Sequence, residues 1–233
     1  MQQFEYLDEG NVPEIFLKIR NFENEPWFVN KYNNVKKIFY NDTDNMRAIK
    51  EVWEPITYIR DNIYLGGVNR QRSPHDPFSS PIQHPTDTSI SPHGYVVSHG
   101  ITSVVSVTDA NILWQYQPIR LKNGSIVKIN SLNYYFPDDD QIAIYDIFDK
   151  IADFIMENAI IHKRKLFIHC RAGISRSATL LTAFYLKYSN MSLEEILTMI
   201  RSKRPYVRPN DMFLKQLIVY EMEMKMRRRK NHK

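Results

Sequence analysis

Short β-branched runs alternate along the chain with longer stretches in which apolar residues recur every three to four positions. Residues 101–107 are rich in valine, isoleucine and threonine, which is typical of a strand buried on both faces. From residue 142 onward, isoleucine and phenylalanine recur at helical spacing up to Ile155. Strands interspersed with helices predict an α/β domain, with a central mixed, mostly parallel sheet flanked by helices.

Turn and capping signals mark the ends of further predicted strands and helices. Residues 56–65 predict a hairpin that turns at Asp61-Asn62, and Asn123-Gly124 predicts a second one between 119–121 and 126–129. Residues 166–169 predict a strand, and residues 178–188 predict a mostly apolar helix. Ser192 and Glu195 form a capping box for a third helix, and Asn210 can cap a fourth.

The same pattern gives a domain organisation. We expect residues 1–54 to be an N-terminal extension that packs on or covers the core, and residues 55–225 to be the main domain. Residues 68–93 hold five of the twelve prolines and three Ser-Pro pairs, which predicts an irregular surface insertion; a docking or phosphoregulated loop is the alternative. Residues 226–233 predict a basic C-terminal tail.

The candidate chemistry lies at residues 168–177, Ile-His-Cys-Arg-Ala-Gly-Ile-Ser-Arg-Ser, between the predicted strand 166–169 and the next helix. Loop amides and a helix N-terminus at this point form an anion site, and a thiol there ionises readily. Arg176 is a planar cation suited to grip two phosphoryl oxygens, Gly173 lets the chain turn, and Ser177 can hydrogen-bond the sulfur. The alternative, that Cys170 is an inert core residue, does not explain its polar neighbours.

These residues resemble the signature of the cysteine-dependent protein phosphatases, His-Cys-x-x-Gly-x-x-Arg-Ser, and in particular the dual-specificity phosphatase family. The resemblance extends over about residues 56–225, including 62–67, 99–105, 204–205 and 210–217. It implies that Cys170 is the nucleophile and becomes a phosphocysteine. It also implies that His169 orients and tunes the thiol, that Ser177 assists breakdown of the intermediate, and that the loop holds the phosphate through Arg171, Ala172, Gly173, Ile174, Ser175 and Arg176.

The leaving oxygen needs a proton donor, which the family supplies as an aspartate about thirty residues before the cysteine. Here residues 132–140 read Leu-Asn-Tyr-Tyr-Phe-Pro-Asp-Asp-Asp, and the period-two alternation of apolar residues continues onto Asp138. We predict Asp138 as the general acid, with Asp139 as the nearest alternative. A solvated turn before a helix is the structural alternative for the whole cluster.

Composition indicates in which compartment this chemistry takes place and which partners are not expected. Cys170 is the only cysteine, so no internal disulfide can form, which fits a reducing compartment. Neither a secretory signal nor a run of about 20 apolar residues is present in the sequence, so we expect no membrane span. The net charge of +5 is too small to indicate nucleic-acid binding. We expect a cytoplasmic protein, with a nuclear location as the alternative that the basic tail indicates.

The leading interpretation is a protein phosphatase that hydrolyses phosphotyrosine and phosphoserine/phosphothreonine in phosphorylated proteins, without metal or cofactor. One alternative is a phosphatase of phosphoinositides or RNA 5′-phosphates; apolar Ala172 and Ile174 disfavour the lipid reading because lipid-directed relatives carry lysines or extra acids there. A non-catalytic phosphoprotein-binding module is the other alternative. It is disfavoured because both the cysteine and the acid are present.

Overall fold

A five-stranded sheet forms the centre of the fold. The computed structural model describes residues 12–39, 54, 56–67, 96, 98–108, 119–120 and 125–231. Within them the strand order is β1-β2-β7-β3-β6. The β1–β2 pair is antiparallel and the other pairs are parallel, so the predicted mixed, mostly parallel sheet is confirmed. The bounds are β1 Ile56–Arg60, β2 Ile63–Gly67, β3 Ser103–Thr108, β6 Asn130–Tyr135 and β7 Leu166–Cys170.

Both predicted hairpins pair as expected. Asp61 and Asn62 connect β1 to β2 with φ of 52° and 63°, which is the left-handed geometry of a tight hairpin turn. A separate two-stranded ribbon pairs β4 (Ile119–Arg120) with β5 (Ile126–Val127) in antiparallel fashion. Its turn residues, 123–124, lie outside the described part of the chain.

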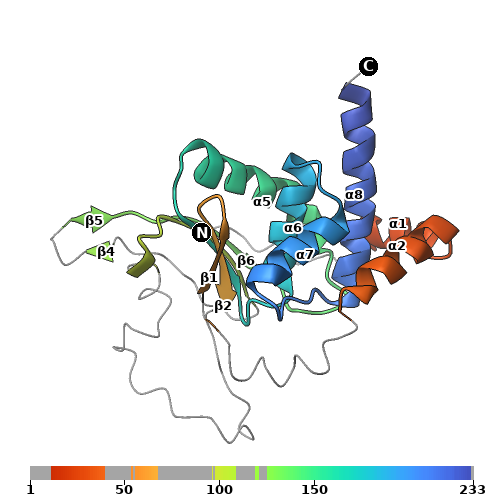
Figure 1. Ribbon diagram of the computed structural model, residues 1–233, viewed down its shortest axis with the longest axis horizontal. Helices are drawn as coiled ribbons and strands as arrows, with labels where there is room; N and C mark the ends of the chain where they lie inside the picture. The colour runs from red at the N-terminus through yellow and green to blue at the C-terminus, as the bar shows by residue number, and fades with distance from the viewer. Residues whose placement is uncertain are drawn as a thin grey trace, which may run out of the picture.

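Helices cover one face of the main sheet (Figure 1). They are η1 (Ile144–Ile147), α5 (Phe148–Ile155), η2 (Met156–Ile161), α6 (Arg176–Tyr188), α7 (Leu193–Lys203) and α8 (Asp211–Asn231). Helix α6 is central, because every residue from Arg176 to Leu186 is buried. On the other face of the sheet, Val104 and Phe167 pack with Val96 and Ile101 in a smaller cluster.

Two of the predicted helix starts are confirmed by their caps. The Ser192 hydroxyl accepts a hydrogen bond from the Glu195 amide, and the reciprocal bond completes the capping box of α7. The Phe213 amide donates to Asn210 Oδ1 over 2.8 Å at the start of α8. Helix α8 continues to Asn231, so residues 226–231 of the predicted basic tail are helical. None of the helices in the described part is long and apolar enough to cross a bilayer.

Two N-terminal helices, α1 (Glu14–Phe22) and α2 (Pro26–Lys37), lie beside α8 (Figure 1). They bury four apolar side chains against the main core, namely Ile15, Ile19, Phe28 and Val35. These helices make up most of the described part of the predicted extension 1–54. The insertion at 68–93 lies outside the described residues.

Candidate active site

The segment from Cys170 to Arg176 connects the end of one central strand to the start of the central helix. Cys170 is the last residue of β7, and Arg176 is the first residue of α6. Strand β7 lies between β2 and β3 and runs parallel to both, so its carboxyl end is in the middle of the sheet edge. Ligands of open α/β sheets bind at this edge. The fold therefore places the loop where a substrate site is expected.

The sulfur of Cys170 is buried in a polar environment. The Gly173 amide and the Ser177 hydroxyl each donate a hydrogen bond to Sγ, both over 3.2 Å. The sulfur also lies at the N-terminus of α6, where helix dipole and unpaired amides favour negative charge. Two hydrogen-bond donors directed at one buried sulfur are not the surroundings of an inert core residue, so the geometry does not support that alternative.

The loop is closed tightly by a glycine. Gly173 has φ of +69°, and a Cβ at this position would lie 2.4 Å from the Gly66 carbonyl carbon at the end of β2. Gly67 is under the same restriction, because its Cβ would lie 2.5 Å from the Ala172 carbonyl carbon. Both contacts are with backbone, so neither neighbour can move away easily. Any larger residue at Gly173 would displace the loop that surrounds the sulfur.

Arg204 holds the outer side of this loop, a role that the sequence did not predict. Its guanidinium is fully buried and donates to the carbonyls of Gly173 (2.9 Å) and Ala172 (3.3 Å). The same group donates to the Glu54 carbonyl and to Thr57 Oγ1, both over 2.8 Å. The Ile174 carbonyl accepts from the amide of Arg208 over 2.9 Å. Three successive loop carbonyls are therefore turned outward, as a nest of inward amides requires.

Asp138 is the acid that the structure brings to this loop. Its Oδ1 accepts hydrogen bonds from Ser175 Oγ (2.8 Å) and from Asn210 Nδ2 (3.0 Å), and Oδ2 lies 3.7 Å from Arg176 Nε. The side chain is 35% exposed, so one part of it remains open to a ligand. Arg176 is fixed in turn by a 2.7 Å bond to the Phe136 carbonyl. A cysteine, an arginine and a carboxylate thus converge on one site.

Asp139, the alternative acid, makes a contact within its own turn instead. Asp139 Oδ1 accepts from the Gln141 amide over 2.8 Å, which is a local turn interaction, and both Asp139 and Asp140 are exposed. Strand β6 ends at Tyr135, earlier than the apolar alternation predicted. Geometry therefore favours Asp138 over Asp139, and its role as the general acid stays a prediction.

Comparison with known proteins agrees with this geometry. The family model of the dual specificity phosphatase catalytic domain matches residues 88–223. The chain belongs to the dual specificity phosphatase family. This membership confirms the expectation of a protein phosphatase that the sequence motif gave.

Individual relatives are similar over the same part of the chain. Human dual specificity protein phosphatase 21 is 44% identical over 131 residues, which are 53% of this chain and 68% of that protein. Human dual specificity protein phosphatase 18 is 35% identical over 127 residues, 54% of this chain and 62% of that protein. A probable dual specificity protein phosphatase of Dictyostelium discoideum is 38% identical over 126 residues, 53% of this chain and 54% of its own length.

Solved structures resemble the fold at lower identity. The crystal structure of human DUSP28 superposes with a TM-score of 0.54 at 21% identity, and covers 75% of this chain and 97% of that one. A structure of PTPMT1 in complex with PI(5)P gives the same TM-score at 18% identity, with coverage of 75% and 99%. At this identity the likeness shows the α/β phosphatase fold alone.

In this phosphatase site, His169 lies behind the nucleophile rather than beside it. Strand alternation places His169 on the opposite face of β7 from Cys170, where its ring stacks on Phe167 at 5.0 Å. Burial lowers the pKa of His169 to about 3, although a hydrogen bond with the Cys170 backbone opposes the shift. The imidazole is therefore neutral at pH 7. Any effect of His169 on the sulfur therefore passes through the Cys170 backbone and not through a positive charge on the imidazole.

Asn210 has a second role besides capping α8. Its side-chain amide donates to Asp138 while its carbonyl oxygen accepts from the helix, and its own backbone amide donates to Ser175 Oγ over 3.2 Å. Capping alone explained this residue in the sequence. The structure shows that one side chain connects the start of α8, the phosphate loop and the acid.

The loop residues between Cys170 and Arg176 differ in exposure, and among them the Ser175 side chain bonds Asp138. Arg171 is exposed, whereas Ala172 and Ile174 are half-buried and Ser175 is buried. No group of three or more histidine, cysteine, aspartate or glutamate side chains with metal-binding geometry occurs in the described ranges. The site's charge is provided by Arg176 and by the amide-lined loop.

Proposed function

We propose that this site hydrolyses phosphotyrosine and phosphoserine/phosphothreonine in proteins through a phosphocysteine formed on Cys170. The observation that carries the proposal is the environment of Sγ, which accepts hydrogen bonds from the Gly173 amide and the Ser177 hydroxyl at the N-terminus of α6. Those donors favour a thiolate before the reaction. The same loop amides and Arg176 then surround the place where a phosphoryl group binds.

In the first step, the thiolate attacks phosphorus in line with the ester oxygen. The S–P bond forms as the P–O bond breaks, and Asp138 transfers its proton to the leaving alkoxide or phenoxide. Asp138 enters this step as the acid and leaves it as the carboxylate that the second step uses. Arg176 stabilises the charge on the equatorial oxygens of the transition state.

In the second step, water attacks the phosphocysteine. The Asp138 carboxylate accepts the proton from water as the O–P bond forms and the S–P bond breaks. Ser177 lies 3.2 Å from Sγ and donates to the departing thiolate, which makes sulfur a better leaving group. Inorganic phosphate is released and the enzyme returns to its starting state.

Removing Asp138 tests its assignment as the acid. We expect Asp138→Ala to lower kcat by about 10²–10⁴-fold on phosphoserine and phosphotyrosine peptides, because their leaving groups need a proton. The loss on p-nitrophenyl phosphate should be much smaller, since p-nitrophenolate leaves without help. Asp139→Ala is the matched control and should leave both rates nearly unchanged. Small and equal losses on both substrates in Asp138→Ala would contradict the assignment.

The substrate class is tested by comparing phosphate release from three kinds of substrate. Phosphopeptides should be hydrolysed faster than inositol phospholipids or triphosphate-ended RNA, because the loop presents Ala172 and Ile174 where extra basic or acidic groups would suit an inositol headgroup. An inositol phospholipid has to be included among the substrates, because the similar PTPMT1 structure was solved in complex with PI(5)P. Cys170→Ser should bind the preferred phosphopeptides without hydrolysis, and this variant can select them from a panel. Faster release from the lipid would overturn the protein-substrate proposal.

The single cysteine supports a further part of the proposal, a cytoplasmic site of action. Without a second cysteine, no intramolecular disulfide can protect Cys170 from oxidation, so a reducing compartment preserves activity. Localisation of the tagged full chain by microscopy tests this, and a nuclear signal would favour the alternative based on the basic C-terminal sequence.

A further inference from the structure

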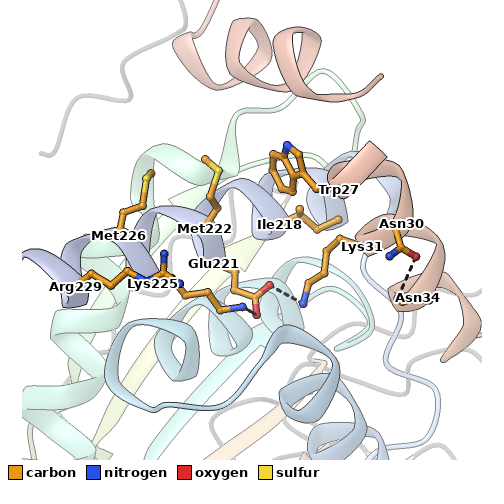
Figure 2. Close-up of a pocket in the computed structure, with 10 residues that line it drawn as sticks. All are labelled: Trp27, Asn30, Lys31, Asn34, Ile218, Glu221, Met222, Lys225, Met226 and Arg229. Atoms are coloured by element: carbon orange, nitrogen blue, oxygen red, sulfur yellow. Dashed lines mark hydrogen bonds and ion pairs between the residues drawn. The ribbon is translucent and has the colours of Figure 1, made fainter. Parts of the chain in front are cut away.

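A concave surface separate from the phosphate loop lies between α2 and α8 (Figure 2). This α2–α8 groove has a volume of about 380 Å³. Its lining comes from residues 27–34 of α2 and residues 218–229 of α8. A helix rises about 1.5 Å per residue, so the groove begins about 12 Å along α8 from Asn210 and ends about 28 Å from it. A ligand in the groove would leave the phosphate loop open.

One side of the groove is apolar and exposed. Trp27 is 41% exposed and Met226 is 45% exposed, and Met222 lies one turn before Met226 on α8. Figure 2 shows the Trp27 ring and both methionine side chains on the same side of α8. Tryptophan is a frequent anchor of protein interfaces, and flexible methionine side chains adapt to varied apolar partners. This side of the groove suits an apolar side chain of a ligand.

The charged side of the groove is mainly basic. Glu221, its one lining carboxylate, is only 5% exposed and is paired with Lys31 (2.7 Å) and Lys225 (2.9 Å). Lys225 nevertheless remains 51% exposed. Arg229 lies one turn further along α8, and no carboxylate within the described ranges pairs with it. Lys31 is also paired with Glu194 of α7, so the three lining cations face two carboxylates. The remaining positive charge lies on the exposed Lys225 and Arg229, next to the apolar side chains.

We propose that the α2–α8 groove binds an acidic peptide segment of a protein partner, with an apolar side chain of the peptide against Trp27 and Met226. Carboxylates of the peptide then pair with Lys225 and Arg229 at the edge of the groove. Asn30 adds an amide that can hydrogen-bond a peptide backbone. A second copy of the chain is a poorer occupant, because the basic edges of two grooves would repel each other. A flat membrane surface fits a concave site less well than a peptide does.

Binding can be measured on the full chain with two libraries of fluorescein-labelled 12-residue peptides. One library is rich in Asp and Glu around a central Leu, Phe or Trp, and its matched counterpart replaces the acids with Lys and Arg. We expect fluorescence anisotropy to detect binding of the acidic library and not of the basic one. With ¹³C-methyl methionine labelling, the NMR signals of Met222 and Met226 should shift on binding, and vanadate in the phosphate loop should not compete.

Two neighbouring positions on α8 provide matched variants. Arg229→Glu should weaken binding of the acidic probe by about tenfold, and Met226→Glu by at least as much. Lys230→Glu makes the same charge change one residue away, about 100° around the helix and outside the groove, and should weaken binding by less than about threefold. All three positions are exposed, so p-nitrophenyl phosphate turnover and the melting temperature should stay at wild-type values.

Several results would overturn the proposal. Equal binding of the acidic and basic libraries, or equal effects of Arg229→Glu and Lys230→Glu, would show that the groove does not select the peptide. Binding only to phosphatidylserine vesicles, lost in Met226→Glu, would assign the surface to a membrane instead. A mass in light scattering that doubles with concentration in the wild type and not in Met226→Glu would assign it to a second copy. Turnover of p-nitrophenyl phosphate is read separately, so its loss would count against the proposed function alone.

Discussion

The phosphate loop and the seam between the N-terminal helices and α8 are stabilised in different ways. The loop is fixed by hydrogen bonds among buried groups, such as those from Arg204 to the carbonyls of Gly173 and Ala172. The seam is bridged by ion pairs at partly exposed side chains, such as Lys18–Glu223 (2.9 Å) and Lys215–Glu23 (3.0 Å). Buried hydrogen bonds are costly to break, whereas exposed ion pairs contribute little and are screened by salt.

This difference shows which part of the molecule must hold its atoms in fixed positions. A displaced loop amide would no longer point at Sγ or at a bound phosphoryl oxygen, so the loop is restrained from β2, β7 and Arg204 together. The N-terminal helices need only cover apolar side chains such as Phe28 and Val35, for which small shifts cost little. The seam can therefore yield without disturbing catalysis, and the loop cannot.

Removal of Arg204 should have the largest effect on stability. Arg204→Met removes the buried donor to the Gly173 and Ala172 carbonyls, at about 1–3 kcal/mol for each bond, so we expect the free energy of unfolding to fall by about 2–6 kcal/mol. Urea denaturation measures this, and p-nitrophenyl phosphate turnover should fall with it. The matched Arg20→Met change, at an exposed position on α1, should cost less than about 0.5 kcal/mol. If Arg204→Met and Arg20→Met lowered the free energy of unfolding equally, the proposed difference between the phosphate loop and the N-terminal helices would be wrong.

An intermediate effect is expected from the pH dependence that His169 introduces. Its pKa in the folded protein is about 3, below the ordinary value of 6.5. Between these values the unfolded chain binds a proton that the folded protein does not, so the free energy of unfolding falls as the pH drops below 6.5. From pH 7 to pH 5 this loss amounts to about 2 kcal/mol.

Urea titrations at several pH values isolate this contribution. His169→Gln should lose less stability on acidification than the wild type does, by about 2 kcal/mol over the same interval. His162→Gln, at an exposed position four residues before β7, is the matched control and should keep the wild-type slope. If the free energy of unfolding of His169→Gln and of the wild type has the same slope against pH, His169 takes up its proton in the folded protein as well. The assignment of a neutral imidazole would then be wrong.

The smallest effect is expected at the seam. Lys215→Ala and Glu23→Ala should each lower the free energy of unfolding by about 0.2–1 kcal/mol, and the double variant should cost little more than either single one. The effect should fade in 1 M NaCl, because the pair is partly exposed. The kcat for p-nitrophenyl phosphate should not change. A loss of kcat would instead show that the N-terminal helices position the active site.

Much of the loop region could be predicted because its signals are local. Cys170, Arg176 and Ser177 lie within eight consecutive residues, and the capping box at Ser192 spans four. Residues this close in sequence also lie close together in the structure, because the end of one strand and the start of the next helix hold them in place. The β-branched run at residues 101–107 likewise predicted the buried strand β3, which spans Ser103–Thr108.

What could not be predicted depends on contacts between distant parts of the chain. Arg204 donates hydrogen bonds to carbonyls 31 and 150 residues away. Every residue has a backbone carbonyl, so the sequence does not show which of them accept these bonds. The alternation of apolar residues favoured Asp138 over Asp139, but it did not predict the hydrogen bonds from Ser175 and Asn210 that reach Asp138 and not its neighbour. The sequence led us to expect that residues 1–54 pack on the core, but it did not show that α8 is the helix they contact. Helices as short as α1 show only about two turns of amphipathic pattern.

The central claim is that Cys170 carries the phosphoryl group during turnover. Rapid acid quench of the wild-type enzyme with a phosphopeptide, followed by mass spectrometry of the fragment that contains Cys170, measures it directly. We expect one added phosphoryl group on Cys170, a larger amount of it in Ser177→Ala because breakdown is slower, and none in Cys170→Ser. Undiminished turnover by Cys170→Ser, or a phosphoryl group found on another residue, would contradict the mechanism.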